Sequence, residues 1–207
     1  MNNQLRPSQN GDPELTRTLV IKYLTIIFWL GLATIIVSLI TWLPIPDSWA
    51  AWVKRAFSVG TILCLFMLTP ANLRYRKSAF LKTAIFCCTI LNLFIGNSLF
   101  SLLASLISVV LSIAACWHLY SAHSELISGH SEKMARNWRR LFWWEVTLSV
   151  IATIVSTVSY ILVPAAVLPF DMIAVFMGIS SWIVVILNTI LTVISLVFLG
   201  LTVNILK

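Results

Sequence analysis

Three ionisable side chains interrupt otherwise apolar stretches of this 207-residue chain: Lys22, Lys82 and Glu145. Each follows a Lys or Arg by five positions, so each lies about 7 Å further along its own helix if the stretches are helical. Ionisable groups at such positions are costly in a membrane and have functional or pairing roles. We expect an intramembrane charge network, in which Glu145 forms an ion pair with one of the lysines or serves a cation or proton path.

Small hydroxyl side chains recur every three or four residues further along the chain, on one face of a predicted helix: Ser98, Ser101, Ser105, Ser108 and Ser112. Such a ridge permits close helix packing, and a polar pathway is the alternative interpretation. Asn92 and Asn188 lie deeper in apolar stretches, where an amide can form hydrogen bonds between helices.

Residue patterns that could support catalysis are incomplete. The segment Ser128-Gly129-His130 resembles the core of a membrane-phosphatase motif, but the basic residues upstream and the second histidine downstream are missing. Cys87 and Cys88 are adjacent on a predicted helix, so they point about 100° apart and do not form a redox or metal-binding pair. We therefore expect no enzymatic activity, no cofactor and no bound metal.

The overall composition is that of an integral membrane protein. Apolar and aromatic residues make up 59% of the chain, only 10% are charged, and the mean hydropathy is +0.96, whereas soluble domains carry about 25% charged residues. This surplus of apolar side chains requires lipid around it. The composition argues against a nucleic-acid-binding domain and a disulfide scaffold.

Six apolar stretches approach the length that an α-helix needs to cross a bilayer, which predicts an all-α, polytopic bundle of six transmembrane helices. The predicted spans are 18–43, 52–69, 79–95, 98–121, 141–168 and 172–199. Prolines end the first two, and Gly96-Asn97 marks a turn between the third and fourth. A five-helix alternative would make 79–121 one bent segment with a re-entrant piece, about 65 Å of helix and twice the bilayer core.

The positions of the basic residues orient this bundle. Short cytoplasmic loops retain Lys and Arg, and an N-in/C-in arrangement with three outward hairpins leaves only Lys54 and Arg55 on the outer side. Residues 1–17 then form a mobile cytoplasmic tail, and 18–207 form the transmembrane domain. The net charge of +7 encodes this topology and contact with anionic lipid, with no nucleic-acid partner required.

A cytoplasmic helical hairpin is predicted at about 122–140. The first helix breaks at Gly129, Ser131 caps the next, and Glu132 pairs with Arg136 one turn later. At 100° per residue this second helix separates two sets of side chains. One side holds Met134, Trp138, Leu141, Phe142 and Glu145, and the other holds Lys133, Arg136, Arg139 and Arg140. The cationic side is a candidate surface for a protein partner or lipid head groups, with topological anchoring as the alternative.

The sequence thus favours a non-catalytic accessory, assembly or regulatory subunit that acts through protein partners bound at the cytoplasmic hairpin. The alternative is a small-solute transporter or the substrate-binding membrane subunit of one. Membrane lipids are its general partners in either case, and we expect it in the cytoplasmic (inner) membrane of a prokaryote. The sequence assigns no oligomeric state.

Overall fold

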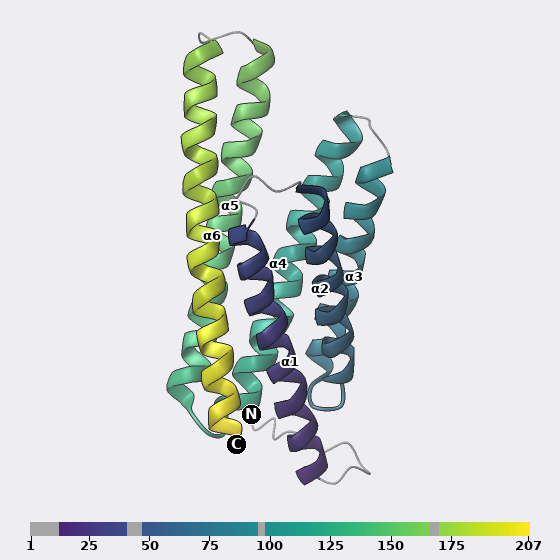
Figure 1. Cartoon of the computed structure of the whole chain (residues 1–207). Coiled ribbons are helices and arrows are strands. Elements are labelled where there is room, and N and C mark those ends of the chain that lie inside the picture. The colour runs from purple at the N-terminus through teal and green to yellow at the C-terminus, as the bar shows by residue number, and fades with distance from the viewer. Residues whose placement is uncertain (1–12, 41–46, 95–97, 166–169) are drawn as a thin grey trace.

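The computed structural model describes residues 13–40, 47–94, 98–165 and 170–207, and these form six helices with no strand among them (Figure 1). The helices are α1 Pro13–Ile40, α2 Asp47–Met67, α3 Leu73–Phe94, α4 Ser98–Ser128, α5 Glu132–Ala165 and α6 Phe170–Leu206. The all-α fold class agrees with the sequence analysis. The predicted Gly96-Asn97 turn and residues 1–12 of the predicted tail lie outside the described residues.

Five of these helices are long and apolar enough to cross a membrane, judged over the described residues: α1, α2, α3, α4 and α6. The remaining predicted span, 141–168, lies in α5 as far as Ala165, and α5 is not among the five; residues 166–168 lie outside the described residues. In α5 the apolar stretch continues directly from the charged start of the same helix, so the second half of the predicted hairpin and the predicted span share one helix. The protein is therefore a helical membrane protein with at least five candidate spans.

Four helices begin two to six residues before their predicted spans: α1, α2, α3 and α6. α1 starts at Pro13, so residues 13–17 are helical and do not belong to the tail; proline suits a first helical position because its backbone nitrogen needs no partner there. α3 starts at Leu73 and not near residue 79. The Asn72 side-chain oxygen accepts a hydrogen bond from the Arg74 backbone N–H at 2.9 Å and caps this helix, so the basic turn before the apolar stretch is already helical.

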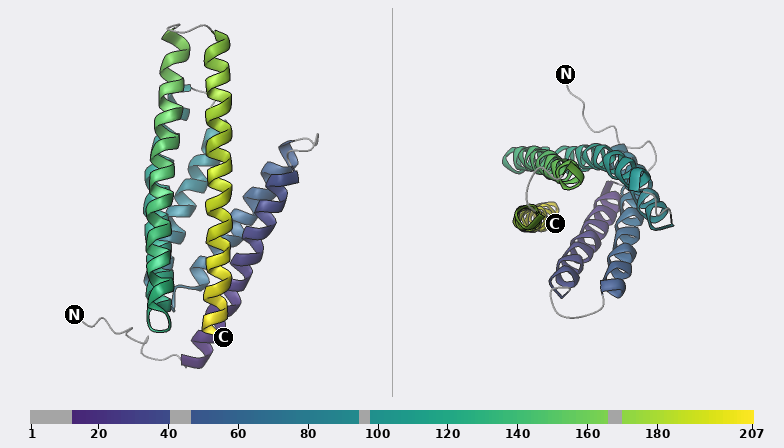
Figure 2. Two further views of the ribbon diagram at one scale, coloured as in Figure 1. Left: turned by 90° about the vertical axis from the view of Figure 1, so that its left-hand side faces the viewer. Right: turned by 90° about the horizontal axis from the view of Figure 1, so that it is seen from above.

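Each helix packs against the next one in the chain, and α1 also packs against α6. The start of α1 and the end of α6 lie at the same end of the bundle (Figure 1). The α5–α6 pair stands beside the other four helices and extends further at the opposite end (Figures 1 and 2). We call the end that contains the starts of α1, α3 and α5 and the ends of α2, α4 and α6 the basic end.

The hydrophobic core is concentrated at the basic end. Its fully buried side chains include Leu24 of α1, Leu65 of α2, Ile127 of α4 and Trp138 of α5. Away from this end, large apolar side chains such as Val110 point outward, with 67% of its surface exposed. Such exposure fits helices whose surroundings are lipid.

Hydrogen bonds between helices reinforce this core. Trp138 donates its indole N–H to the Thr202 hydroxyl at 3.0 Å and joins α5 to α6. The Tyr75 hydroxyl lies 2.9 Å from His123 Nδ1 and joins α3 to α4. Because all four side chains are buried, these bonds satisfy polar groups that would otherwise be costly.

The termini of the described helices are also connected at this end. The Arg17 guanidinium donates hydrogen bonds to the backbone oxygens of Leu206 at 2.6 Å and Lys207 at 3.0 Å. Leu206 is the last residue of α6 and Lys207 follows it, so these oxygens lack helical partners and a cation is favourable beside them. Arg17 therefore links the first turns of α1 to the end of α6.

Candidate binding cavity

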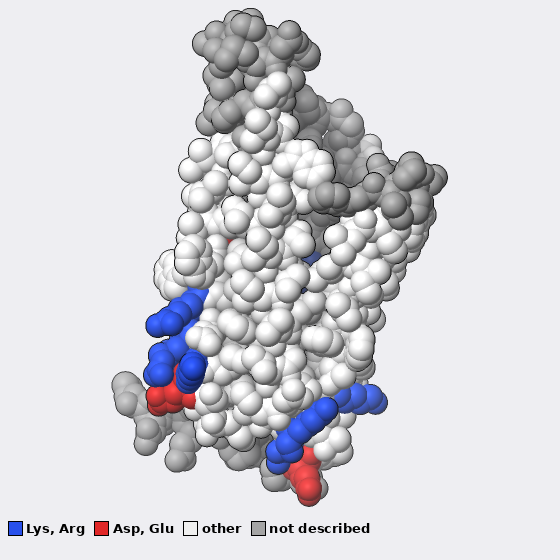
Figure 3. Space-filling view, turned by 60° about the vertical axis from the view of Figure 1, so that its left-hand side comes forward, with Lys and Arg blue, Asp and Glu red and all other residues white. Residues whose placement is uncertain are grey.

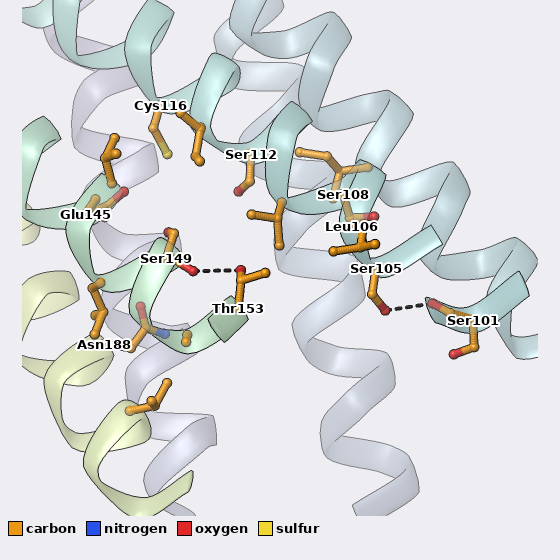
Figure 4. A pocket seen from close by; sticks show the side chains of 17 residues that line it. Ser101, Ser105, Leu106, Ser108, Ser112, Cys116, Glu145, Ser149, Thr153 and Asn188 are labelled. Carbon is orange, nitrogen blue, oxygen red and sulfur yellow. Dashed lines mark hydrogen bonds between the residues drawn. The ribbon is translucent and has the colours of Figure 1, made fainter. Parts of the chain in front are cut away.

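A cavity of about 880 Å³ lies between α4, α5 and α6, with one residue of α3 in its wall (Figure 4). Its volume is within the range of small-molecule binding sites, about 300 to 1,000 Å³. The polar side chains that line it are Ser101, Ser105, Ser108, Ser112, Cys116, Glu145, Ser149, Thr153 and Asn188. Apolar side chains such as Ile85, Leu106 and Val146 complete the wall.

The serine ridge predicted from the sequence forms the α4 side of this cavity. Ser101, Ser105, Ser108 and Ser112 all line it, and the side chain of Ser98 lies outside the described residues. The expectation that this ridge brings two helices into close contact is therefore not met, since the serines adjoin an open space.

An aromatic layer lies between the cavity and the basic end. There, Tyr120 of α4 stacks on Trp138 of α5 with ring centroids 5.3 Å apart, and Trp117 lies edge-on to Phe142 at 5.0 Å. The Ser124 hydroxyl donates to the Ala135 backbone oxygen at 3.0 Å, so α4 and α5 are in direct contact at this end. The two helices diverge away from it (Figure 1), and the lining side chains do not fill the space between them.

Glu145 lies at the end of the cavity near the aromatic layer, beside Cys116 (Figure 4). Its carboxylate accepts a hydrogen bond from the Tyr120 hydroxyl at 2.7 Å. Tyr120 is almost fully buried, so this bond holds the carboxylate in one orientation.

The predicted ion pair between Glu145 and Lys22 or Lys82 is absent from the described part of the chain. Its ion pairs are Arg74–Glu125 at 2.8 Å and Arg136–Glu132 at 3.3 Å. Lys22 is exposed on α1, which packs against α2 and α6 and not against α5. Lys82 lies on α3, three residues before Ile85 of the cavity wall.

Tyr120 is the residue that the sequence analysis missed. A signal for it exists, because Ser112, Cys116 and Tyr120 follow one another at intervals of four and continue the ridge toward the basic end. The ridge was recognised from its serines alone, so its extension through a cysteine and a tyrosine was overlooked.

Asn188 contributes the only amide among the described residues that line the cavity. It lies midway along the 37-residue helix α6, and its side chain is exposed. Within the described structure no hydrogen bond reaches this amide group, whereas the Asn188 backbone oxygen accepts one from Thr192 at 2.8 Å. An amide at mid-helix thus remains available to a molecule in the cavity.

The cationic side of the predicted hairpin forms a second feature, outside the cavity. Charged side chains gather toward the basic end on the face shown in Figure 3. Exposed on α5 are Lys133, Arg136, Arg139 and Arg140, while the opposite side, with Met134, Trp138, Leu141 and Phe142, is buried. The predicted separation of the two sides is confirmed in its burial pattern.

The local structure of this hairpin also agrees with the sequence. α4 ends at Ser128 and α5 begins at Glu132, so the break at Gly129 is confirmed. The Ser131 hydroxyl accepts a hydrogen bond from the Met134 backbone N–H at 3.3 Å, as an N-cap does.

The histidines do not form a metal site within the described residues, which contain no group of three or more potential ligands. His123 is instead part of the buried core, where its ring stacks on Trp138 at a centroid distance of 4.6 Å. Comparison of the chain with models of protein families, with curated proteins and with solved structures finds no match. The cavity and the cationic side of α5 therefore supply the functional argument.

Proposed function

We propose that the protein is a non-catalytic membrane protein that binds a small solute in the cavity, as a small-solute transporter or the substrate-binding membrane subunit of one. The observation that carries this proposal is the convergence of Glu145, the serine ridge and Asn188 on one cavity of about 880 Å³. These residues come from three helices, and a mostly apolar pocket with a few polar groups is the usual form of a ligand site. This ranks the solute-binding function above the partner-binding function that the sequence favoured.

The proposed topology has six transmembrane helices, with α5 as the sixth, and the basic end in the cytoplasm of a prokaryotic cell. It is supported by the distribution of Lys and Arg, because only Lys54 and Arg55 of α2 lie toward the opposite end of the described helices. Cysteines introduced at Lys54 and Arg136 test it. A membrane-impermeant maleimide applied to intact cells should label the first and not the second.

Native mass spectrometry of the protein, extracted gently from its own membrane, is the first test of solute binding. We expect a small bound mass on the wild-type chain. The variant Ser108→Leu places a larger apolar side chain in the cavity wall and should lose that mass while remaining folded. Ser58→Leu on the exposed side of α2 is the matched control and should keep it. A wild-type spectrum without any retained small molecule, even after incubation with candidate solutes, would contradict the proposal.

A second candidate function is that of an accessory, assembly or regulatory subunit that docks a protein partner on the cationic side of α5. It is favoured by four exposed cations on a helix held in place by the buried Trp138. Of these four cations, only Arg136 has an ion pair with another described residue. The double variant Arg136→Glu/Arg140→Glu should then release a co-purified polypeptide, and Lys77→Glu at the same end should not. A complex that survives the double reversal excludes this surface.

A further inference from the structure

We infer that the ligand of the cavity is an elongated amphiphile with a single cationic head group, an amine or a quaternary ammonium, bound at Glu145. This inference rests on the proposed solute-binding function and adds the chemical class of the solute. Three properties of the cavity lead to it: its shape, its charge and its orientation.

The cavity is long. Its α4 wall runs from Ser101 to Cys116, which corresponds to about 22 Å of helix. An extended molecule can lie along this wall, and the volume of about 880 Å³ is within the range of small-molecule sites.

The described wall of the cavity carries one charged side chain. This is Glu145, and no Lys, Arg or His lines the cavity with it. Lys82 of α3 lies outside the wall, within electrostatic range of Cys116. A carboxylate in a medium of low dielectric constant attracts a cation strongly and repels an anion. Because Tyr120 donates to one carboxylate oxygen, the second oxygen can accept a hydrogen bond from an ammonium group.

The rest of the wall accommodates a hydrocarbon chain. Many of the lining side chains are aliphatic, among them Leu106, Val109 and Ile113. The hydroxyls of Ser105 and Thr153 donate to backbone oxygens of their own helices at 2.8 and 2.7 Å (Figure 4). Since these hydroxyls already have acceptors, they do not require a polar ligand beside them.

In this cavity a bound amphiphile would have the same orientation as a lipid in the bilayer, with its head group toward the surface and its chain toward the membrane centre. Glu145 lies toward the basic end and Ser101 at the far end (Figure 4), so a bound head group sits near the proposed cytoplasmic surface and the chain points toward the membrane centre. Ser105, Ser112 and Asn188 are exposed, so the cavity is open along its side. A cationic amphiphile of the inner leaflet can therefore enter sideways without turning over.

Three probes with the same chain and different head groups test the inference: tetradecylamine, tetradecanol and tetradecanoate. Their binding to the full-length protein in a non-ionic detergent is measured by native mass spectrometry over a concentration series. An alkylamine is cationic at pH 7. We expect one bound tetradecylamine per chain, with an affinity about tenfold or more above that of tetradecanol, and no binding of tetradecanoate.

The variant Glu145→Gln keeps the shape of the side chain and removes its charge. It should therefore bind tetradecylamine and tetradecanol with similar affinity. Glu132→Gln is the matched control, because Glu132 is an exposed carboxylate on the same helix and lies outside the cavity. If Glu145→Gln does not fold, the comparison of amine with alcohol on the wild-type protein tests the charge preference alone.

The outcomes separate this inference from the proposed function. Equal affinities for amine and alcohol on the wild type, unchanged in Glu145→Gln, would overturn the cationic preference and leave solute binding in place. Failure of all three probes, together with no retained mass from the native membrane, would overturn both. A photo-crosslinker placed at Ser108 that captures a stoichiometric transmembrane polypeptide would place a helix in the cavity and overturn the small-molecule ligand.

Discussion

The basic end and the cavity region are built from the same α4–α5 pair but from side chains of different size. At the basic end, Trp138 is only 1% exposed and stacks between neighbours from other helices. In the cavity region the lining residues include serines and aliphatic side chains and no aromatic ring. The two helices are in direct contact at the basic end and diverge beyond it (Figure 1), where the lining side chains leave a cavity. One helix pair thus supplies both part of the packed core and part of the cavity wall.

This comparison assigns stability to one region and ligand binding to the other. Hydrogen bonds between side chains of different helices, such as Tyr75–His123 and Trp138–Thr202, lie at the basic end. In the cavity region, the hydroxyls of Ser105 and Thr153 bond only to their own helices. Substitutions in the two regions should therefore differ sharply in their effect on the free energy of unfolding.

The largest loss is expected from Trp138→Ala. It removes a fully buried indole and leaves the Thr202 hydroxyl without its donor, at a cost of about 3 to 5 kcal/mol. Unfolding of the purified protein by denaturing detergent measures it. Trp144→Ala, at a position 66% exposed on the same helix, is the control and should cost about 0.5 kcal/mol or less. Equal losses of unfolding free energy in both variants would contradict the distinction between core and lipid-facing tryptophans.

A smaller loss is expected from Tyr75→Phe. The substitution keeps the ring but leaves buried His123 Nδ1 without its partner, which costs about 1 to 3 kcal/mol. The same unfolding measurement applies. Tyr23→Phe is the control, because the Tyr23 hydroxyl has no hydrogen bond within the described structure, and it should be close to neutral. A neutral Tyr75→Phe would mean that the polar link between α3 and α4 does not contribute.

Arg17→Met should cost about 1 kcal/mol, because two partly exposed hydrogen bonds to the end of α6 are lost. The clearest measurement is hydrogen–deuterium exchange, which should become faster in the last turn of α6 and stay unchanged in α3. Arg139→Met on the exposed side of α5 should leave exchange in α6 as it is. Unchanged exchange in the Arg17 variant would show that α6 does not depend on this contact.

The smallest effect is expected from Ser105→Ala, within about 0.5 kcal/mol of the wild type, because the hydroxyl bonds only to its own helix. The same substitution at Ser78 provides the sharpest comparison of the two regions. Ser78 is buried and donates to the Ala115 backbone oxygen of the neighbouring helix at 3.0 Å. Ser78→Ala should therefore cost about 1 kcal/mol, and a reversed order would contradict the division between the regions.

Features that depend on neighbouring residues of one helix could be predicted from the sequence. The break at Gly129, the Ser131 cap and the Glu132–Arg136 pair all involve residues within four positions of one another. The buried and cationic sides of α5 follow from a periodicity of 100° per residue in the same way. The start of α3 was misplaced because its basic residues resemble a loop, while the cap at Asn72 makes them helical.

The candidate site could be predicted only in its separate parts. Glu145, the serine ridge and Asn188 were each recognised, yet the expected partner of Glu145 was a lysine and the structure supplies Tyr120. To choose between these partners, one must know the distances between three helices and the rotation of each about its own axis. Those quantities are set by side chains elsewhere, and no local pattern contains them.

The sequence by itself determined that this is an all-α membrane protein, that a helix breaks at Gly129, and which side of α5 is apolar, because composition and short-range periodicity decide these properties. Only the tertiary structure decided that the serine ridge adjoins a cavity and not another helix. The physical reason is that the angle between α4 and α5 depends on contacts between several helices: the two are in direct contact at the basic end and diverge beyond it (Figure 1). The side chains that line the diverging part leave the space between them open.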